Sequence, residues 1–137
     1  MKKQKIFLAD YILNHLPDSV IVVNRQGTIM MVNDNCCKLL GYKREEIIGQ
    51  SASIFFVKAE EKPGEEKAPG KTITSQENEI YLGKILDELI LNGYVNNLEV
   101  NFLTRTGQRI PVSFNGVVLR DADKEILGVL GLARDMR

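Results

Sequence analysis

The sequence predicts an α+β fold: a five-stranded antiparallel sheet with helices on one face and an N-terminal flanking helix. Three observations predict it. Residues 19–32 have the pattern of a β-hairpin, residues 98–133 have that of a three-stranded meander, and the segment between them has mainly helical periodicity. Because antiparallel strands joined by short turns pair with their neighbours, the hairpin and the meander supply five strands of one sheet. The 137 residues are enough for one domain with a real core.

The first element is an amphipathic helix, predicted over residues 4–16. Its apolar side chains recur at the spacing of one helical face, and they are Ile6, Phe7, Ala9, Tyr11, Leu13 and Leu16. Pro17 ends the helix. The apolar stripe is wider than one contact with the chain's own sheet requires. We therefore expect it to join two copies as a homodimer through Phe7, Tyr11 and Leu13.

The hairpin follows directly. Ser19–Asn24 is rich in the β-branched residues that favour strands, and Thr28–Val32 repeats this character. Arg25-Gln26-Gly27 between them has the composition of a turn.

Short helices come next. Asn33-Asp34-Asn35 supplies side chains that accept hydrogen bonds from the first free amides of a helix. The helix over residues 35–40 ends at Gly41, which suits a left-handed C-cap. A second helical turn begins at residues 43–46. Residues 54–57, Ile-Phe-Phe-Val, are apolar enough to be anchored in the core.

Residues 58–79 differ in composition from the rest. They are rich in Gly, Pro, Lys and Glu and nearly lack large apolar side chains, which predicts a solvated, mobile loop. Helical periodicity returns over residues 80–92. We therefore divide the chain into an N-terminal helix, residues 1–17, and a domain, residues 18–137, that contains this loop.

The last third is the meander. Leu98–Thr104 and Arg109–Leu119 flank the turn Arg105–Gln108, and a second turn at residues 120–124 leads to Ile126–Ala133. Polar turns between runs of strand-forming residues predict three adjacent antiparallel strands.

Composition excludes several functions. Lys plus Arg and Asp plus Glu both number 18, so the chain lacks the net positive charge of a nucleic-acid binder. No apolar run approaches the roughly 20 residues that span a bilayer, and no signal peptide opens the chain. We expect a cytoplasmic location without direct membrane contact. The single histidine, His15, lies in the predicted N-terminal helix, so we expect no Ser/His/Asp arrangement and no catalysis. No metal-spaced His/Cys cluster is present, so we expect no metal site.

The two cysteines, Cys36 and Cys37, are adjacent and do not make a disulfide framework. They are interpreted either as small, partly buried residues on a helix or as the vicinal thiols of a redox sensor. A soft-metal site would need further ligands.

The order of these elements, with these residues, resembles the PAS domain family over roughly residues 11–137. Four blocks carry the resemblance in this order and spacing. They are Leu16–Asn24 with Gly27–Ile29 and Val32-Asn33; Leu39–Tyr42 with Glu45–Gly49; Leu98–Val100 with Arg105–Gly107 and Ile110–Val112; and Gly128–Met136. PAS domains are sensor and dimerisation modules, and some hold a cofactor against the inner face of the sheet.

The resemblance implies a non-catalytic sensor module of a bacterial or archaeal signalling protein. It would relay a ligand- or conformation-derived signal to a C-terminal effector, in a two-component histidine kinase. Arg134 and Asp135 match the family's exit motif, in which an Asp fixes the linker that carries the signal onward. The main alternative is a ligand-free homodimerisation module. A less favoured one is a thiol redox sensor using Cys36 and Cys37.

Neither haem nor flavin is expected from the resemblance. Haem-binding members use an axial His on the long helix before the meander, and residues 80–92 contain none. Photoactive flavin-binding members carry a reactive Cys well after the Asn33 position, whereas Cys36 and Cys37 follow Asn33 almost at once. Those members also hold the flavin with polar side chains on the last three strands. The comparable positions here are Phe102, Val112 and Ala133.

Strand alternation predicts one inner face of the meander. It carries Val100, Phe102, Ile110, Val112, Phe114, Val129, Gly131 and Ala133. This face is either an ordinary core, with small residues for close packing, or a small, mostly apolar pocket for a small-molecule ligand. The pocket-lining candidates are Val100, Phe102, Val112, Phe114, Gly131 and Ala133. The opposite face, with Val117, Leu130 and Leu132, is too apolar to face water entirely.

Overall fold

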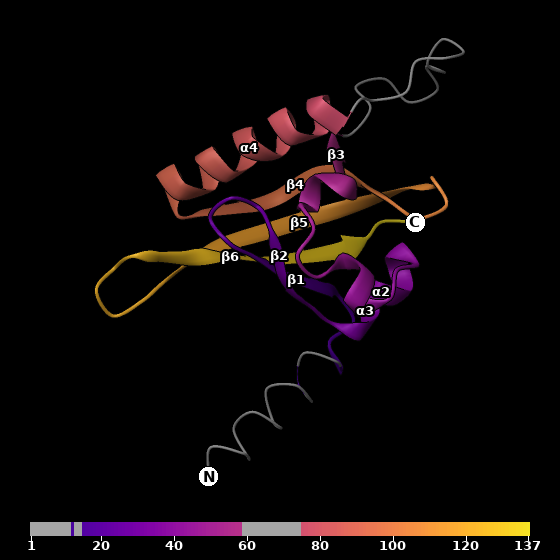
Figure 1. Cartoon of the computed structure of the whole chain (residues 1–137), viewed down its shortest axis with the longest axis horizontal. Helices are drawn as coiled ribbons and strands as arrows, with labels where there is room; N and C mark the ends of the chain where they lie inside the picture. The colour runs from indigo at the N-terminus through magenta and orange to yellow at the C-terminus, as the bar shows by residue number, and fades with distance from the viewer. Residues whose placement is uncertain (1–11, 13–14, 59–74) are drawn as a thin grey trace.

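The computed structural model of the chain describes residue 12, residues 15–58 and residues 75–137 (Figure 1). Its centre is one antiparallel sheet with the strand order β2-β1-β6-β5-β4-β3. The strands are β1 (Ser19–Val23), β2 (Ile29–Val32), β3 (Phe56–Lys58), β4 (Tyr94–Leu103), β5 (Arg109–Arg120) and β6 (Ile126–Asp135). The helical elements are α2 (Asp34–Leu40), α3 (Arg44–Ile47), the 3₁₀ helix η1 (Ala52–Ile54) and α4 (Ser75–Asn92). The predicted α+β architecture is confirmed.

The sheet has six strands, one more than the sequence predicts. The additional strand, β3, has three residues and pairs with β4, where Phe56 lies opposite Phe102. A short apolar run has no periodicity that separates a strand from a buried turn. Its partner strand also lies far along the chain, so nothing local reveals the pairing.

β4 begins at Tyr94 rather than at Leu98, the predicted start. Consecutive asparagines predict a loop, but the sheet accommodates them as a bulge, with a register shift between Val95 and Leu98. Asn97 has a positive φ of 53° and donates its backbone N–H to Oδ1 of Asn115 at 2.9 Å. The bulge keeps the strand paired where the sequence suggests a break.

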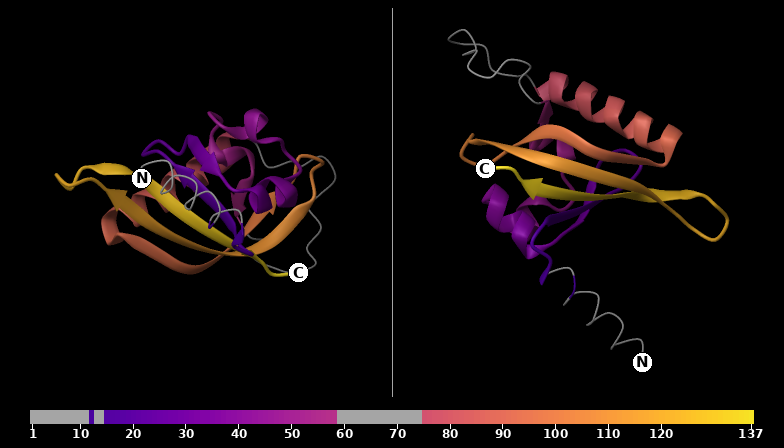
Figure 2. Two further views of the ribbon diagram at one scale, coloured as in Figure 1. Left: turned by 90° about the horizontal axis from the view of Figure 1, so that it is seen from below. Right: turned by 180° about the vertical axis from the view of Figure 1, so that it is seen from behind.

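The helices and the inner face of the sheet enclose one core. The sheet is strongly curved; α4 packs against β3, β4 and β5, whereas α2 packs against β1 (Figures 1 and 2). α4 begins at Ser75, ahead of the predicted residue 80, and one apolar stripe of it is buried. The buried side chains of that stripe are Leu82, Ile85, Leu86 and Leu89. None of the helices within the described ranges is long and apolar enough to cross a membrane.

Two predictions concern residues outside the described ranges. The dimer residues Phe7, Tyr11 and Leu13 lie there, as does most of the loop predicted at residues 58–79. Both stay predictions there. At its ends the predicted loop is wrong, because Lys58 belongs to β3 and residues 75–79 belong to α4.

Candidate functional site

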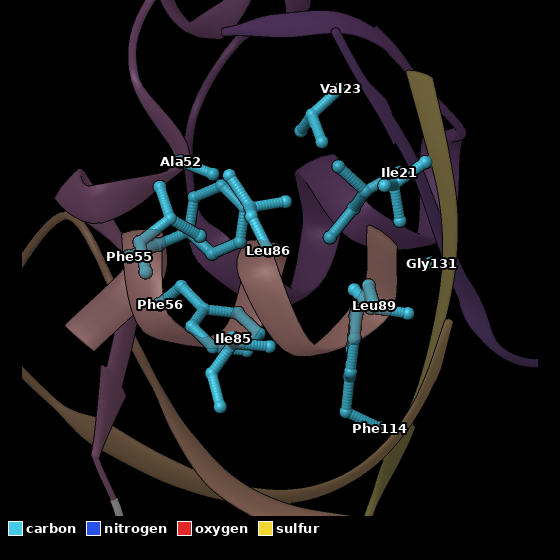
Figure 3. Close-up of a pocket in the computed structure, with 12 residues that line it drawn as sticks. Ile21, Val23, Ala52, Phe55, Phe56, Ile85, Leu86, Leu89, Phe114 and Gly131 are labelled. Carbon is cyan, nitrogen blue, oxygen red and sulfur yellow. The ribbon is translucent and has the colours of Figure 1, made fainter. Parts of the chain in front are cut away.

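A small apolar cavity of about 30 Å³ lies between α4 and the inner face of the sheet (Figure 3). α4 contributes Leu82, Ile85, Leu86 and Leu89, and β1, η1, β3, β5 and β6 complete the wall. All of the lining side chains are hydrocarbons. A water molecule needs only about 10–15 Å³ but also two to four polar partners, so this cavity suits an apolar occupant better than water.

The six predicted pocket residues are divided between the cavity and the surrounding core. Phe114 and Gly131 line the cavity. The other four are also buried, but they lie outside the wall of the cavity: Val100, Phe102, Val112 and Ala133. The strand register explains how they share a face, because Val100 lies opposite Val112 and Phe114 lies opposite Ala133.

Most of the cavity wall comes from elements that the sequence prediction did not include. The first hairpin contributes Ile21 and Val23, and the segment around β3 contributes Phe55 and Phe56. The helical periodicity of residues 80–92 was the one sequence pattern that could have indicated that α4 forms part of the cavity wall. No comparable signal pointed to the hairpin, because its strands alternate in the same way whether they border a cavity or a filled core.

The start of β1 and the end of β6 lie side by side. Ser19 is the register partner of Ala133, so the chain enters and leaves the sheet at the same end of two neighbouring strands. Nε of Arg134 lies 3.5 Å from Oδ1 of Asp18, which is the residue before β1. Because Arg134 is exposed, this ion pair contributes under about 1 kcal/mol to stability. What the ion pair does is connect the residue before β1 with the end of β6, which are the two ends of the domain.

Asn33 holds the same junction together from α2. It is the N-cap of α2, and its Oδ1 accepts from the backbone N–H of Cys36 at 3.0 Å. The same oxygen accepts from the N–H of Val20 at 2.9 Å, and Nδ2 donates to the carbonyl of Asp18 at 3.0 Å. The side chain is buried. One amide thus connects the residue before β1, the strand β1 and the first turn of α2. From the sequence, Asn33 was predicted only to begin a helix.

Asp135, the predicted exit residue, closes a local turn at the end of β6. Its carboxylate accepts from the backbone N–H of Arg137 at 3.0 Å and pairs with Nη2 of Arg137 at 2.8 Å. These hydrogen bonds with Arg137 lower the pKa of the Asp135 carboxyl. The N–H of Met136 donates to the carbonyl of Pro111 at 2.9 Å, which continues the pairing beyond β6. These bonds order the two residues that follow β6.

The adjacent thiols, Cys36 and Cys37, both have raised pKa values. Burial, and in second place Cys37, raises the pKa of Cys36 from 9.0 to about 12. Burial also raises the pKa of Cys37, which is half-buried. Arg44 acts to lower the pKa of Cys37, but burial outweighs it. Reactive cysteines have lowered pKa values, so the raised values favour the interpretation as structural thiols. Within the described ranges, no three His, Cys, Asp or Glu side chains are grouped to hold a metal ion.

The chain belongs to the PAS domain family, because residues 17–137 match the sequence pattern of the PAS domain. It is therefore a PAS sensor domain. A 40-residue stretch is 42% identical to the sensor protein kinase WalK of Staphylococcus aureus; this covers 29% of the chain and about a tenth of that protein.

Two solved structures have the same fold. The PAS domain of a protein from Colwellia psychrerythraea superposes with a TM-score of 0.74 at 19% identity, over 96% of this chain and 97% of that one. A PAS domain from a two-component sensor histidine kinase superposes with a TM-score of 0.73 at 13% identity, over 98% and 99%.

Proposed function

We propose that the chain is a non-catalytic sensor module that relays a ligand- or conformation-derived signal to a C-terminal effector. The observation that carries this proposal is the course of β6. This strand lines the cavity at Val129 and Gly131 and ends at Asp135, in the exit turn. At about 3.3 Å per residue, roughly 13 Å of strand separates Gly131 from Asp135. A displacement at the cavity would therefore reach the exit along a single paired strand.

The effector is proposed to be the kinase part of a two-component histidine kinase. The match to a sensor protein kinase supports this assignment, although the chain spans only about a tenth of that relative. The fold shared with a sensor histidine kinase PAS domain agrees with it.

The proposed sensor uses neither haem nor flavin. Ligand pockets of ordinary size have about 300–1,000 Å³, whereas this cavity has about 30 Å³. An all-hydrocarbon wall also leaves the polar edge of a flavin without hydrogen bonds. The purified domain should accordingly lack a visible absorption band, and a band that follows the protein through purification would contradict this part of the proposal.

The decisive experiment uses the full-length protein and the exit turn. Asp135→Ala should leave the free energy of unfolding within about 1 kcal/mol, because its ion pair is exposed. We expect the ratio of stimulated to basal autophosphorylation to fall toward one. Asp123→Ala, which removes another exposed carboxylate in the β5–β6 turn, is the matched control and should keep the ratio. An unchanged ratio in the Asp135 variant would reduce that residue to a surface position.

A second candidate, a ligand-free homodimerisation module, is favoured by one observation. The outer face of the sheet has an apolar groove of about 460 Å³ with exposed Tyr94 and Val117 and half-buried Leu130 and Leu132. An exposed apolar surface of this kind is typical of an interaction site. We propose that residues 4–16 contribute to such a dimer.

Native mass spectrometry separates the two candidates. A small molecule that accompanies the domain supports the sensor, whereas a ligand-free dimer supports the dimerisation module. If Leu13→Glu leaves the sedimentation coefficient of a dimer unchanged, the N-terminal helix is not the interface.

A further inference from the structure

Two glycines face each other across β5 and β6 on the inner side of the sheet. Gly116 is the register partner of Gly131. A Cβ atom on Gly131 would lie 2.6 Å from Cε2 and 2.9 Å from Cζ of Phe114. One on Gly116 would lie 3.1 Å from Cε1 of the same ring and 3.1 Å from Cδ2 of Leu89, so Gly116 is covered by both side chains whereas Gly131 is covered by the ring. One aromatic ring therefore covers both glycines, in the manner by which aromatic side chains compensate for glycines in designed sheets.

Phe114 also lines the cavity. Phe114 is buried, and its ring meets the ring of Phe56 edge-on, with centroids 5.1 Å apart and an interplanar angle of 81° (Figure 3). The hollow above the two glycines is thus nearly filled by a side chain of the chain itself. Only the remaining 30 Å³ or so is open to another molecule.

On the basis of the sensor function proposed above, we propose that Phe114 determines ligand size. With its ring over the two glycines, the domain accepts only a compact apolar molecule without hydrogen-bonding groups. A hydrocarbon cavity cannot compensate the desolvation of a polar group. A benzene-sized molecule needs a cavity of about 150 Å³, as an engineered apolar cavity shows, so the domain should admit benzene only when the ring is absent.

The first arm of the test measures ligand size in the isolated chain. Xenon under pressure should shift the methyl resonances of Leu89 and Ile85 in the unsubstituted protein, whereas benzene should not. Phe114→Ala, or Phe114→Leu where the alanine variant fails to fold, should admit benzene. At a benzene concentration ten times its Kd, the unfolding equilibrium constant of that variant should fall about elevenfold. Val112→Ala shortens a buried residue on the same strand and face but outside the cavity wall, and it should not admit benzene.

The second arm measures the contact between the ring and the glycines. Gly131→Ala places its Cβ against Phe114, so it should lower the urea midpoint and abolish the xenon shifts as the ring is forced toward the cavity. In the Phe114→Leu background the same substitution should cost clearly less, because the ring is gone. A double-mutant cycle isolates this coupling.

Three results would overturn the assignment: benzene binding with Phe114 intact, a folded Phe114 variant that admits nothing larger than xenon, or an equal cost of Gly131→Ala in both backgrounds. All of these measurements need only the isolated chain. A full-length kinase that ignores a molecule shown to bind would contradict the proposed sensor function instead, and the size assignment would stand.

Discussion

Replacing Asn33 by alanine tests how strongly the junction of β1 and α2 depends on one side chain. The substitution removes the acceptor for two buried backbone N–H groups, those of Val20 and Cys36, and the donor for the carbonyl of Asp18. Each buried polar group left without a partner costs about 1–3 kcal/mol. The carbonyl is only partly buried and can bind water, so we count the two N–H groups and expect a loss of about 2–6 kcal/mol.

The assay is urea unfolding followed by circular dichroism, with an unchanged slope and a lower midpoint. Asn24→Ala is the matched control. Its Oδ1 also accepts from two backbone N–H groups, those of Gln26 and Thr28, at 3.0 and 2.9 Å, but in a turn that water reaches. We expect this variant to lose under about 1 kcal/mol. If the two alanine variants lost equal free energy, burial would not be what makes Asn33 important, and the reasoning would fail.

Two glycines and the two cysteines give further predictions. Gly128→Ala should prevent folding, because its Cβ would lie 2.2 Å from the backbone carbonyl oxygen of Val23. Gly83→Ala lies in open space on α4 and should raise the free energy of unfolding by about 0.5–1 kcal/mol. Thermal unfolding of the soluble fraction of each variant checks both expectations. A thiol reagent at pH 8 should label Cys37 in the native protein and Cys36 only in denaturant, and rapid native labelling of both would contradict the pKa assignment. Because the pKa of Cys36 is about 12 in the folded chain and ordinarily 9.0, the unfolded chain ionises first as the pH rises above 9, so stability should fall there, as urea midpoints at pH 8 and 10 would show.

Much of the fold was predictable because its signals are local. The β-branched residues of β1, the glycine turn at Gly27 and the alternation along β5 and β6 each describe a strand or turn from neighbouring residues alone. β3 was missed because its identity depends on a partner in β4. The early start of β4 was missed because asparagines, which usually form loops, lie in a bulge there, where Asn97 bonds to the side chain of Asn115 on the next strand.

The candidate site was less predictable, for a physical reason. Small residues such as Gly131 correctly indicate where backbone atoms leave space, but they do not reveal what fills it. Here the filling group is the ring of Phe114, whose position depends on its rotamer and on contacts with Phe56. The same limit applies to Asn33, because its bonds to Val20 and Asp18 depend on the hairpin bringing β1 back to the start of α2.

The pairing of β1 with β6 has a mechanical consequence. The five register pairs of these strands run from Ser19 opposite Ala133 to Val23 opposite Val129. The N-terminal flank leaves at the first of these pairs, and the C-terminal flank leaves two residues beyond it, after Asp135. A force that separates those segments would open the ladder one pair at a time from that end, as a zipper opens, instead of loading all the hydrogen bonds together in shear. Tension between the flanks would therefore peel the middle of the sheet at low force while its outer strands stay paired.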